Sequence, residues 1–133
     1  MPFKILIVDD ETDIVRSLSM RLKHAGYEVI VASDGLTAIS MATRNLPDLI
    51  LLDIGLPCGD GHLVATRLNV NSKTMGTPII FLTARTSDAN RAKATEAGVY
   101  AYVTKPFQAD ELLRIIERAL SGQPLVDCSH KDG

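Results

Sequence analysis

The chain has 133 residues, 46% of them hydrophobic, and a formal net charge of −2. This length suits one domain whose core is large enough to fold without disulfides or a structural metal. Lysine and arginine are scattered along the chain, which argues against direct binding of nucleic acid or an anionic membrane. No apolar run is long enough to span a bilayer and no secretory leader precedes the first strand pattern, so we expect a cytoplasmic protein without membrane insertion.

The first third of the chain alternates strand and helix patterns. Residues 3–8 form a β-rich run, and apolar residues at helical spacing predict a helix over 12–25. Gly26 is placed to end that helix in a left-handed cap. Residues 28–32 predict a second strand, and the pattern from 35 to 46 predicts a second amphipathic helix, which Pro47 closes.

The middle of the chain begins with a continuous apolar run over Leu49 to Asp53, bounded by turn residues. Such a run is typical of a parallel strand covered on both faces. A third helix is expected to start near Asp60 or Gly61, followed by a polar connection over 69–77. Residues 78–82 predict the fourth strand.

The last third repeats the alternation. An alanine-rich segment over 87–97 predicts a fourth helix, and residues 99–103 predict the fifth strand. Helical spacing then predicts a final helix with Leu112, Ile115, Ile116 and Leu120 on its buried face. Residues 122–133 show no periodicity and are expected to form a flexible C-terminal tail.

Five strand-to-helix units in strict alternation define the fold class. They predict a single α/β domain, a three-layer doubly wound (βα)5 arrangement around a five-stranded parallel sheet. Right-handed crossovers leave few strand orders, and we expect the order 2-1-3-4-5. In such sheets ligands bind at the carboxyl ends of the strands, near the switch point between strands 1 and 3.

Polar residues follow four of the predicted strands at that edge: Asp9, Asp10, Asp53, Thr83 and Lys105. Carboxylates crowded there would repel one another by about 4 kcal/mol per pair at about 4 Å and an effective dielectric of about 20. Lys105 can offset one charge, and hard oxygen ligands beside solvent suit Mg²⁺, or Mn²⁺. A carboxylate beside such a cation, with a hydroxyl and an ammonium nearby, is equipped for phosphoryl transfer, with Asp53 as the nucleophile.

Each of these residues also has a purely structural interpretation. Asp9 could cap the first helix, and Asp53 alone could be a turn former. Thr83 could cap a turn, and Lys105 could be a solvated lysine at a strand end. The adjacency expected for strands 1 and 3 favours the functional interpretation.

These residues together carry a family resemblance. The chain resembles a receiver domain of response regulators in two-component signalling, the CheY-like superfamily. The matching pieces are Asp9-Asp10, the strand ending at Asp53, Leu56-Pro57, Asp60-Gly61, Thr83-Ala84 and the stretch from Tyr102 to Phe107. The resemblance implies a receiver domain over residues 1–121.

It further implies that Asp53 accepts a phosphoryl group from a histidine kinase or a phosphotransfer protein. Asp10 would ligate Mg²⁺ directly and Asp9 through water, with Asp53 and the backbone carbonyl of Gly55 completing the protein's ligands. Thr83 and Lys105 would bind the phosphoryl group.

The resemblance also implies a switch. Thr83 would move toward the phosphoryl group and Tyr102 would rotate inward behind it, altering the surface formed by helix 4, strand 5 and helix 5. An unidentified protein target would bind that surface. Gly55 and Arg85 occupy positions that influence dephosphorylation in this family, so the resemblance leaves the phosphate's lifetime open.

Two alternatives stay open beside this signalling role, in which the chain is not an enzyme. One is a Mg²⁺-dependent phosphohydrolase that passes through an aspartyl phosphate. The haloacid-dehalogenase type expects a second Asp two residues after the nucleophile, where this chain has Gly55. The other is a pseudo-receiver that works without phosphorylation, which the complete set of site residues argues against.

Overall fold

The computed structural model describes residues 2–54, 61–83, 99–105 and 107–122. The predicted fourth helix, Gly55 and residues 123–133 lie outside these ranges. The described elements are β1 (Lys4–Val8), α1 (Thr12–His24), β2 (Glu28–Ala32), α2 (Gly35–Asn45), β3 (Leu49–Asp53), α3 (Gly61–Val70), β4 (Ile79–Thr83), β5 (Ala101–Thr104) and α5 (Ala109–Leu120).

The five strands form one parallel sheet in the order β2-β1-β3-β4-β5. This confirms the predicted fold class and strand order. Because the chain runs from β1 out to β2 and then back past β1 to β3, the direction of winding reverses between β1 and β3. The carboxyl ends of these two strands therefore define the switch point of the sheet.

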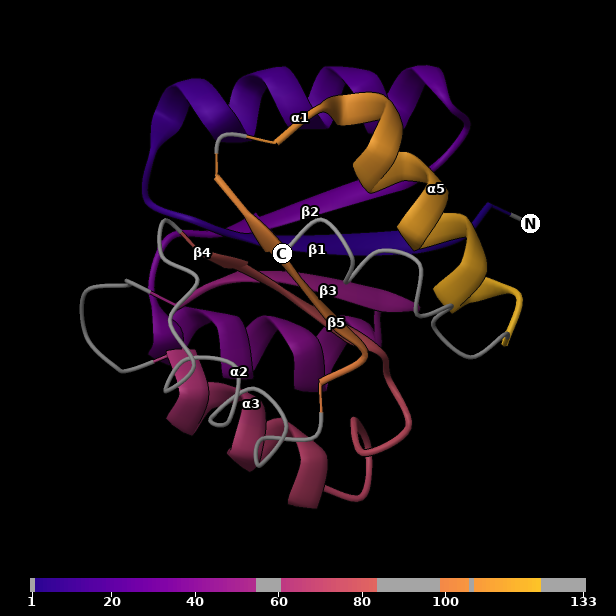
Figure 1. Ribbon diagram of the computed structural model, residues 1–133. Helices are drawn as coiled ribbons and strands as arrows, with labels where there is room; N and C mark the ends of the chain where they lie inside the picture. Colours follow the sequence, from indigo (N-terminus) through magenta and orange to yellow (C-terminus); the bar gives the residue numbers. More distant parts are fainter. Residues whose placement is uncertain (1, 55–60, 84–98, 106, 123–133) are drawn as a thin grey trace.

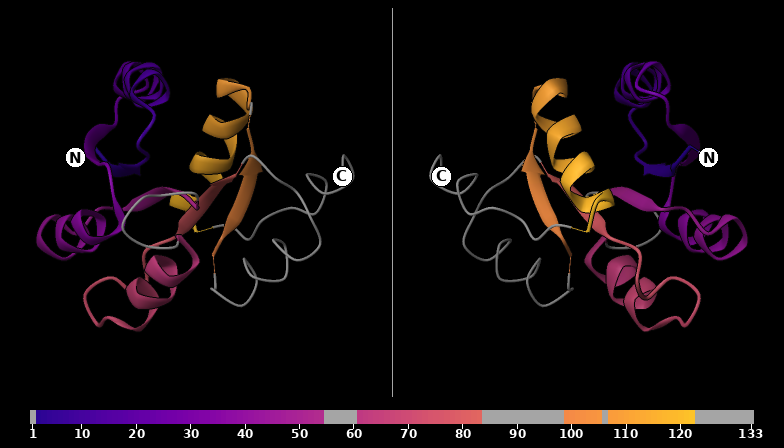
Figure 2. Two further views of the ribbon diagram at one scale, coloured as in Figure 1. Left: turned by 90° about the vertical axis from the view of Figure 1, so that its left-hand side faces the viewer. Right: turned by 90° about the vertical axis from the view of Figure 1, so that its right-hand side faces the viewer.

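Helices cover both faces of the sheet, with α1 and α5 on one side and α2 and α3 on the other (Figure 1). The views turned by 90° show the same two layers (Figure 2). Strand β3 is buried throughout: Leu49 and Leu51 pack with α1 and α5, whereas Ile50 and Leu52 pack with α2 and α3. This alternation with period two explains why β3 has no polar residue before Asp53.

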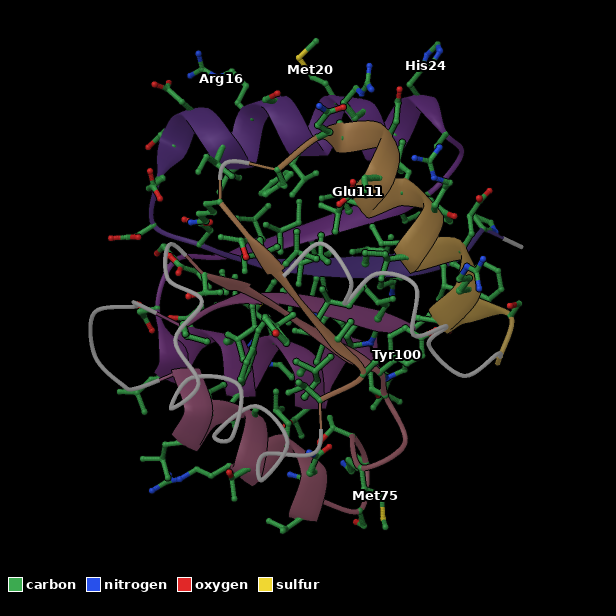
Figure 3. All side chains as sticks on the ribbon, in the orientation of Figure 1. Arg16, Met20, His24, Met75, Tyr100 and Glu111 are labelled. Atoms are coloured by element: carbon green, nitrogen blue, oxygen red, sulfur yellow. The ribbon has the colours of Figure 1, made fainter. Side chains whose placement is uncertain are left out.

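The helices on the sheet are amphipathic, as their apolar spacing predicts. In α1, Leu18 and Leu22 are buried, while Arg16, Met20 and His24 point away from the sheet (Figure 3). Across the described ranges, none of the helices combines the length and the apolar character that a membrane crossing requires.

Local signals set several element ends. Gly26 follows Ala25, the C-cap of α1, and adopts φ +97°, a conformation that favours glycine, as predicted. Asp34 caps α2, because its Oδ1 accepts a hydrogen bond of 2.8 Å from the backbone N–H of Thr37. Strands β2 and β3 have the predicted bounds.

The predicted start of the fifth strand is wrong by two residues, since β5 begins at Ala101 rather than at Val99. Tyr100 already donates a backbone hydrogen bond of 2.8 Å to Ile79 O, but the chain bends there before the strand begins. The β-rich composition of residues 99–100 therefore extends beyond the strand itself. Strand β4 has the predicted length but lies one residue later than the predicted 78–82, since it begins at Ile79 and ends at Thr83.

Candidate functional site

The site lies where β1 and β3 end side by side. Val8 pairs with Leu52 in the parallel register, so Asp9 and Asp53 are the next residues along their strands. Asp9 is held in line with the sheet because its backbone N–H donates to Ala32 O over 3.1 Å. The sequence places carboxylates at these two positions, and the parallel register brings them together.

Three carboxylates form an acidic group at this edge. Asp9, Asp10 and Asp53 each offer an oxygen that lies within 4.8 Å of the oxygens of the other two. Asp9 and Asp53 are buried, with 1% and 8% of their surfaces exposed, whereas Asp10 is exposed to solvent. Two buried carboxylates and one exposed carboxylate form a hard-oxygen donor set open to water, which suits Mg²⁺.

Lys105 follows β5 and reaches into this group. Its Nζ lies 3.0 Å from Asp9 Oδ2, 2.9 Å from Glu11 Oε1 and 3.5 Å from Asp53 Oδ2. Only 11% of the Lys105 side chain is exposed. The sequence predicts that Lys105 offsets one charge, and the structure shows that this ammonium contacts three carboxylates.

The environment raises the pKa values of both buried partners, for different reasons. Burial raises the pKa of the Asp9 carboxyl, against the lowering effect of the Glu11 backbone N–H and of Lys105. Burial also tends to lower the pKa of the Lys105 ammonium, but its hydrogen bonds to Glu11 and Asp9 and the charge of Asp53 outweigh burial and raise that pKa. The ammonium therefore stays protonated at physiological pH.

Thr83 and Tyr102 lie on the neighbouring strands. Thr83 ends β4, is buried with 4% exposure, and its carbonyl accepts a hydrogen bond of 2.6 Å from the backbone N–H of Lys105. Tyr102 pairs with Phe81 in the register and packs on the side of the sheet covered by α2 and α3. Phe81 belongs to the same cluster, so alternation along β4 assigns Thr83 to that side as well.

Gly61 closes the described part of the site from the side of α3. A Cβ built on Gly61 would overlap Ile54 Cα and would lie 3.0 Å from the carbonyl oxygen of Asp53. The Gly61 backbone N–H also donates to Ile54 O over 3.4 Å. The start of α3 therefore packs against the backbone at the end of β3, an approach that only glycine permits.

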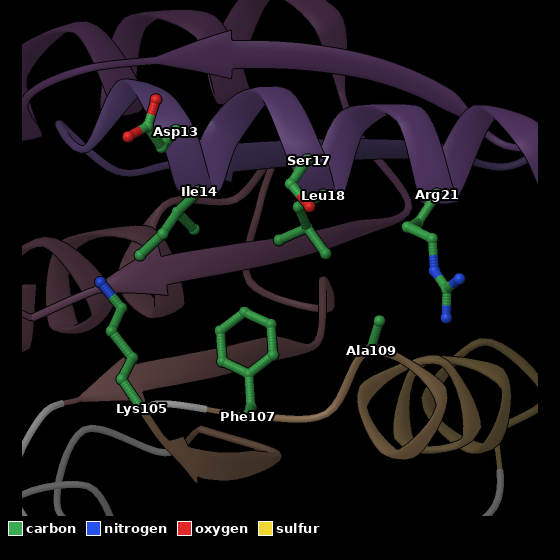
Figure 4. Close-up of a pocket in the computed structure, with 8 residues that line it drawn as sticks. All are labelled: Asp13, Ile14, Ser17, Leu18, Arg21, Lys105, Phe107 and Ala109. Atoms are coloured by element: carbon green, nitrogen blue, oxygen red, sulfur yellow. The ribbon is translucent and has the colours of Figure 1, made fainter.

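A groove of about 300 Å³ lies beside the site, between α1 and the segment that follows β5 (Figure 4). Ile14 and Leu18 of α1 face Phe107 across it, and the Lys105 ammonium lies toward the Ile14 end. Arg21 lines the groove at the end where it pairs with Asp110 over 2.7 Å. Lys105 is thus shared between the groove and the acidic group.

Glu11 is a residue of the site that the sequence does not predict. It is visible as the third acidic residue of the run that begins at Asp9. Nothing in its local spacing connects it with Lys105, which lies 94 residues further along the chain. The remaining site predictions concern described residues, except for Gly55, which lies outside the described ranges.

Comparison with known proteins agrees with this fold and site. Residues 5–117 match the family of response regulator receiver domains, and the chain belongs to this family. Its members act in two-component signalling and are signalling proteins rather than classical enzymes. The family resemblance found in the sequence is therefore confirmed.

Among curated proteins, the chain is 39% identical to the transcriptional regulatory protein PrrA of Mycobacterium tuberculosis, over 88% of this chain and 49% of PrrA. It is 40% identical to the transcriptional regulatory protein KdpE of the same species, over 87% of this chain and 50% of KdpE. The chain spans about half the length of the curated relatives it matches.

Two solved structures show the same fold. A CheY-like response regulator receiver domain protein from Methanospirillum hungatei matches with a TM-score of 0.87 and 30% identity, over 100% of both chains. The receiver domain of sensor histidine kinase PA1611 from Pseudomonas aeruginosa matches with a TM-score of 0.84 and 32% identity, over 91% of this chain and 99% of that one. The PA1611 receiver domain has a magnesium ion coordinated in its active site cleft.

Proposed function

We propose that this chain is a phosphoacceptor whose Asp53 takes a phosphoryl group from the phosphohistidine of a histidine kinase or phosphotransfer protein. The observation that carries the proposal is the contact between Lys105 and Asp53, 3.5 Å from Nζ to Oδ2, beside two further carboxylates. The receiver domain would comprise residues 1–121. We also propose a cytoplasmic location, where ATP is available to charge a histidine kinase.

Asp53 is the carboxylate of this group best placed to react. Asp9 is fully buried as a side chain and already accepts hydrogen bonds on both oxygens, from the Glu11 N–H and from Lys105. Asp10 is exposed and lies beyond the end of β1. Asp53 ends the central strand with 11% of its side chain exposed, next to an ammonium that can stabilise incoming negative charge.

In the proposed transfer, an oxygen of Asp53 bonds to phosphorus while the bond from phosphorus to the donor imidazole nitrogen breaks. The electron pair of that bond stays on the imidazole, and the product is an acyl phosphate on Asp53. Lys105 neutralises charge on the phosphoryl oxygens, and the Thr83 hydroxyl can donate a hydrogen bond to another of them.

The donor set of the site fits Mg²⁺, with Asp9, Asp10 and Asp53 as protein ligands. A predicted further ligand is the Gly55 carbonyl. A bound Mg²⁺ would supply positive charge against the phosphoryl oxygens, and Mn²⁺ has the same ligand preference. The PA1611 receiver domain, which holds magnesium in its cleft, supports this assignment.

We further propose that phosphorylation changes a protein-binding surface through Thr83 and Tyr102. Both residues lie on the side of the sheet covered by α2 and α3, on the adjacent strands β4 and β5. Movement of Thr83 toward the phosphoryl group would free space into which Tyr102 turns. The altered surface would include helix 4, β5 and α5, and its target is an unidentified protein rather than nucleic acid.

The function is tested with a small acyl phosphate as donor and intact-mass measurement. With Mg²⁺, the chain should gain one phosphate, and the gain should disappear in Asp53→Asn and after chelation of the metal. The matched control is Asp13→Asn, an exposed carboxylate on α1, which should be phosphorylated as readily as the unaltered chain. Phosphate uptake that persists in Asp53→Asn, or rapid hydrolysis of unrelated phosphate esters, would contradict the proposal.

A further inference from the structure

Glu11 makes an unusual contact for a residue at the start of a helix. It occupies the N-cap position of α1, yet its side chain forms no capping hydrogen bond there. Asp, Asn, Ser and Thr are preferred at this position because their short side chains reach the free backbone N–H groups. The Glu11 carboxylate instead extends to Lys105, with 2.9 Å between Oε1 and Nζ.

The backbone fixes where Glu11 stands. The Glu11 N–H donates to Asp9 Oδ1 over 2.9 Å, so the turn between β1 and α1 is tied to the buried carboxylate. The other oxygen of Asp9 accepts from Lys105 over 3.0 Å. Asp9, Glu11 and Lys105 therefore form a closed set of contacts, in which Glu11 is the only member with a largely exposed side chain, 57% against 0% and 11%.

The ammonium of Lys105 has three N–H donors. Within the part of the chain that the structure describes, it has three carboxylate partners: Asp9, Glu11 and Asp53. The contacts to Asp9 and Glu11 are the short ones, and Asp53 is the most distant at 3.5 Å. A phosphoryl group arriving at Asp53 must therefore compete with these carboxylates for an N–H of the Lys105 ammonium.

We infer that Glu11 is a positioning residue that holds the Lys105 ammonium closer to itself and Asp9 than to Asp53 in the unphosphorylated chain, and so restrains phosphorylation. Asp9 is buried and anchored on both oxygens, so it cannot move aside readily. Glu11 is exposed, is not part of the acidic donor set, and can return to water when Lys105 turns to the phosphoryl group. This inference rests on the proposed function of Asp53.

The size of the restraint follows from the exposure of Glu11. Ion pairs with an exposed partner are worth little, and their typical range corresponds to about a two- to fivefold change in an equilibrium or rate constant. Removing the contact should therefore raise the initial rate of phosphorylation by about two- to fivefold. The increase in the initial rate should be measured with subsaturating donor, where the rate depends most strongly on the competition between Glu11 and the phosphoryl group for Lys105.

The test compares three variants in the full chain with a small acyl phosphate and Mg²⁺, following phosphate uptake by intact mass. Glu11→Gln removes the charge, and Glu11→Asp keeps the charge but shortens the side chain so that it no longer reaches Lys105. Asp13→Asn removes an exposed charge two residues further on, where the described residues show no ion pair with Lys105. Circular dichroism checks that each variant is folded.

We expect both Glu11 variants to be phosphorylated about two- to fivefold faster than the unaltered chain, and Asp13→Asn to match the unaltered chain. If Glu11→Gln is faster but Glu11→Asp is not, Glu11 acts only through its long-range charge and the inference is wrong. Equal acceleration in Glu11→Gln and Asp13→Asn, or none in either Glu11 variant, overturns it as well. Failure of the unaltered chain to take up phosphate would refute the proposed function itself, which separates the two outcomes.

Discussion

The Lys105 ammonium lies 3.0 Å from Oδ2 of Asp9, whose side chain has no exposed surface. This pair joins the segment after the last strand of the sheet to the end of the first. Taking a charge out of water is costly unless a partner of opposite charge compensates it. Asp9 therefore depends on Lys105, and several properties of the chain should depend on this pair.

Replacing Lys105 with Met should destabilise the fold. The change removes the cation beside the buried Asp9 carboxyl, and removing one partner of a buried ion pair typically costs about 3 kcal/mol or more. The free energy of unfolding, measured by urea denaturation in Mg²⁺-free buffer, should fall by about this amount. Adding Asp9→Asn to Lys105→Met should recover part of the loss, and Lys73→Met, at an exposed lysine, should stay within about 0.5 kcal/mol of the unaltered chain. An equal effect of the two lysine substitutions would show that the pair is not a stabilising contact.

Asp9 and Asp34 should give opposite responses of stability to pH. Burial raises the pKa of the Asp9 carboxyl above its ordinary 3.8, so the folded state binds this proton more tightly than the unfolded state. As the pH falls from 7 through the folded pKa toward 3.8, the unaltered chain should gain stability relative to Asp9→Asn. Thermal unfolding without Mg²⁺ measures this difference.

Asp34 is the matched control for the sign of that effect. The Thr37 N–H lowers the pKa of the Asp34 carboxyl, so its contribution is present above pH 3.8 and is lost as the pH falls through the folded pKa. Relative to Asp34→Asn, the unaltered chain should therefore lose stability on acidification. A common direction for both comparisons would contradict the assigned environments.

Gly61 should tolerate no side chain. A Cβ there would overlap Ile54 Cα and crowd the Asp53 carbonyl at 3.0 Å, so the backbone at the end of β3 would have to move. Gly61→Ala should cost about 1–3 kcal/mol in the free energy of unfolding and should slow phosphorylation of Asp53. Gly76→Ala is the control, because a Cβ at Gly76 meets nothing within 4 Å and its effect should stay within about 0.5 kcal/mol. Equal effects of the two substitutions would mean that the contact with β3 can relax freely.

Mg²⁺ should stabilise the folded chain through the acidic group. At a concentration 100 times its dissociation constant, a ligand that binds only the folded state adds about 2.7 kcal/mol to the free energy of unfolding. This gain should be strongly reduced in Asp10→Asn and retained in Asp13→Asn, whose carboxylate lies outside the acidic group. Calorimetric unfolding with and without a chelator measures it, and an undiminished gain in Asp10→Asn would place the metal elsewhere.

The sequence predicts the sheet well because each strand carries its own signals. In β3, four apolar residues and the turn residues around them define a strand buried on both faces, and both bounds are confirmed. The strand order follows from alternation and the handedness of crossovers. The start of β5 is less well predicted, because β-rich composition does not show where a chain bends before it enters the sheet.

The sequence predicts those contacts of the site that the strand order and register determine. Asp9 and Asp53 meet because the parallel register places β1 and β3 side by side, which the fold class already implies. The contact between Glu11 and Lys105 depends on where two long side chains point across 94 residues of sequence, and no spacing rule encodes it. The same holds for the packing of Gly61 against Ile54, which the sequence shows only as a glycine near a helix start.

The identity of the phosphorylated residue is the most direct test of the proposed role of Asp53. After phosphorylation with a small acyl phosphate and Mg²⁺, borohydride reduction converts an aspartyl phosphate to homoserine, and peptide mass spectrometry locates the converted residue. We expect conversion at Asp53 alone. Conversion at Asp9 or Asp10, or stable phosphate on a hydroxyl or histidine with Asp53 unmodified, would contradict it.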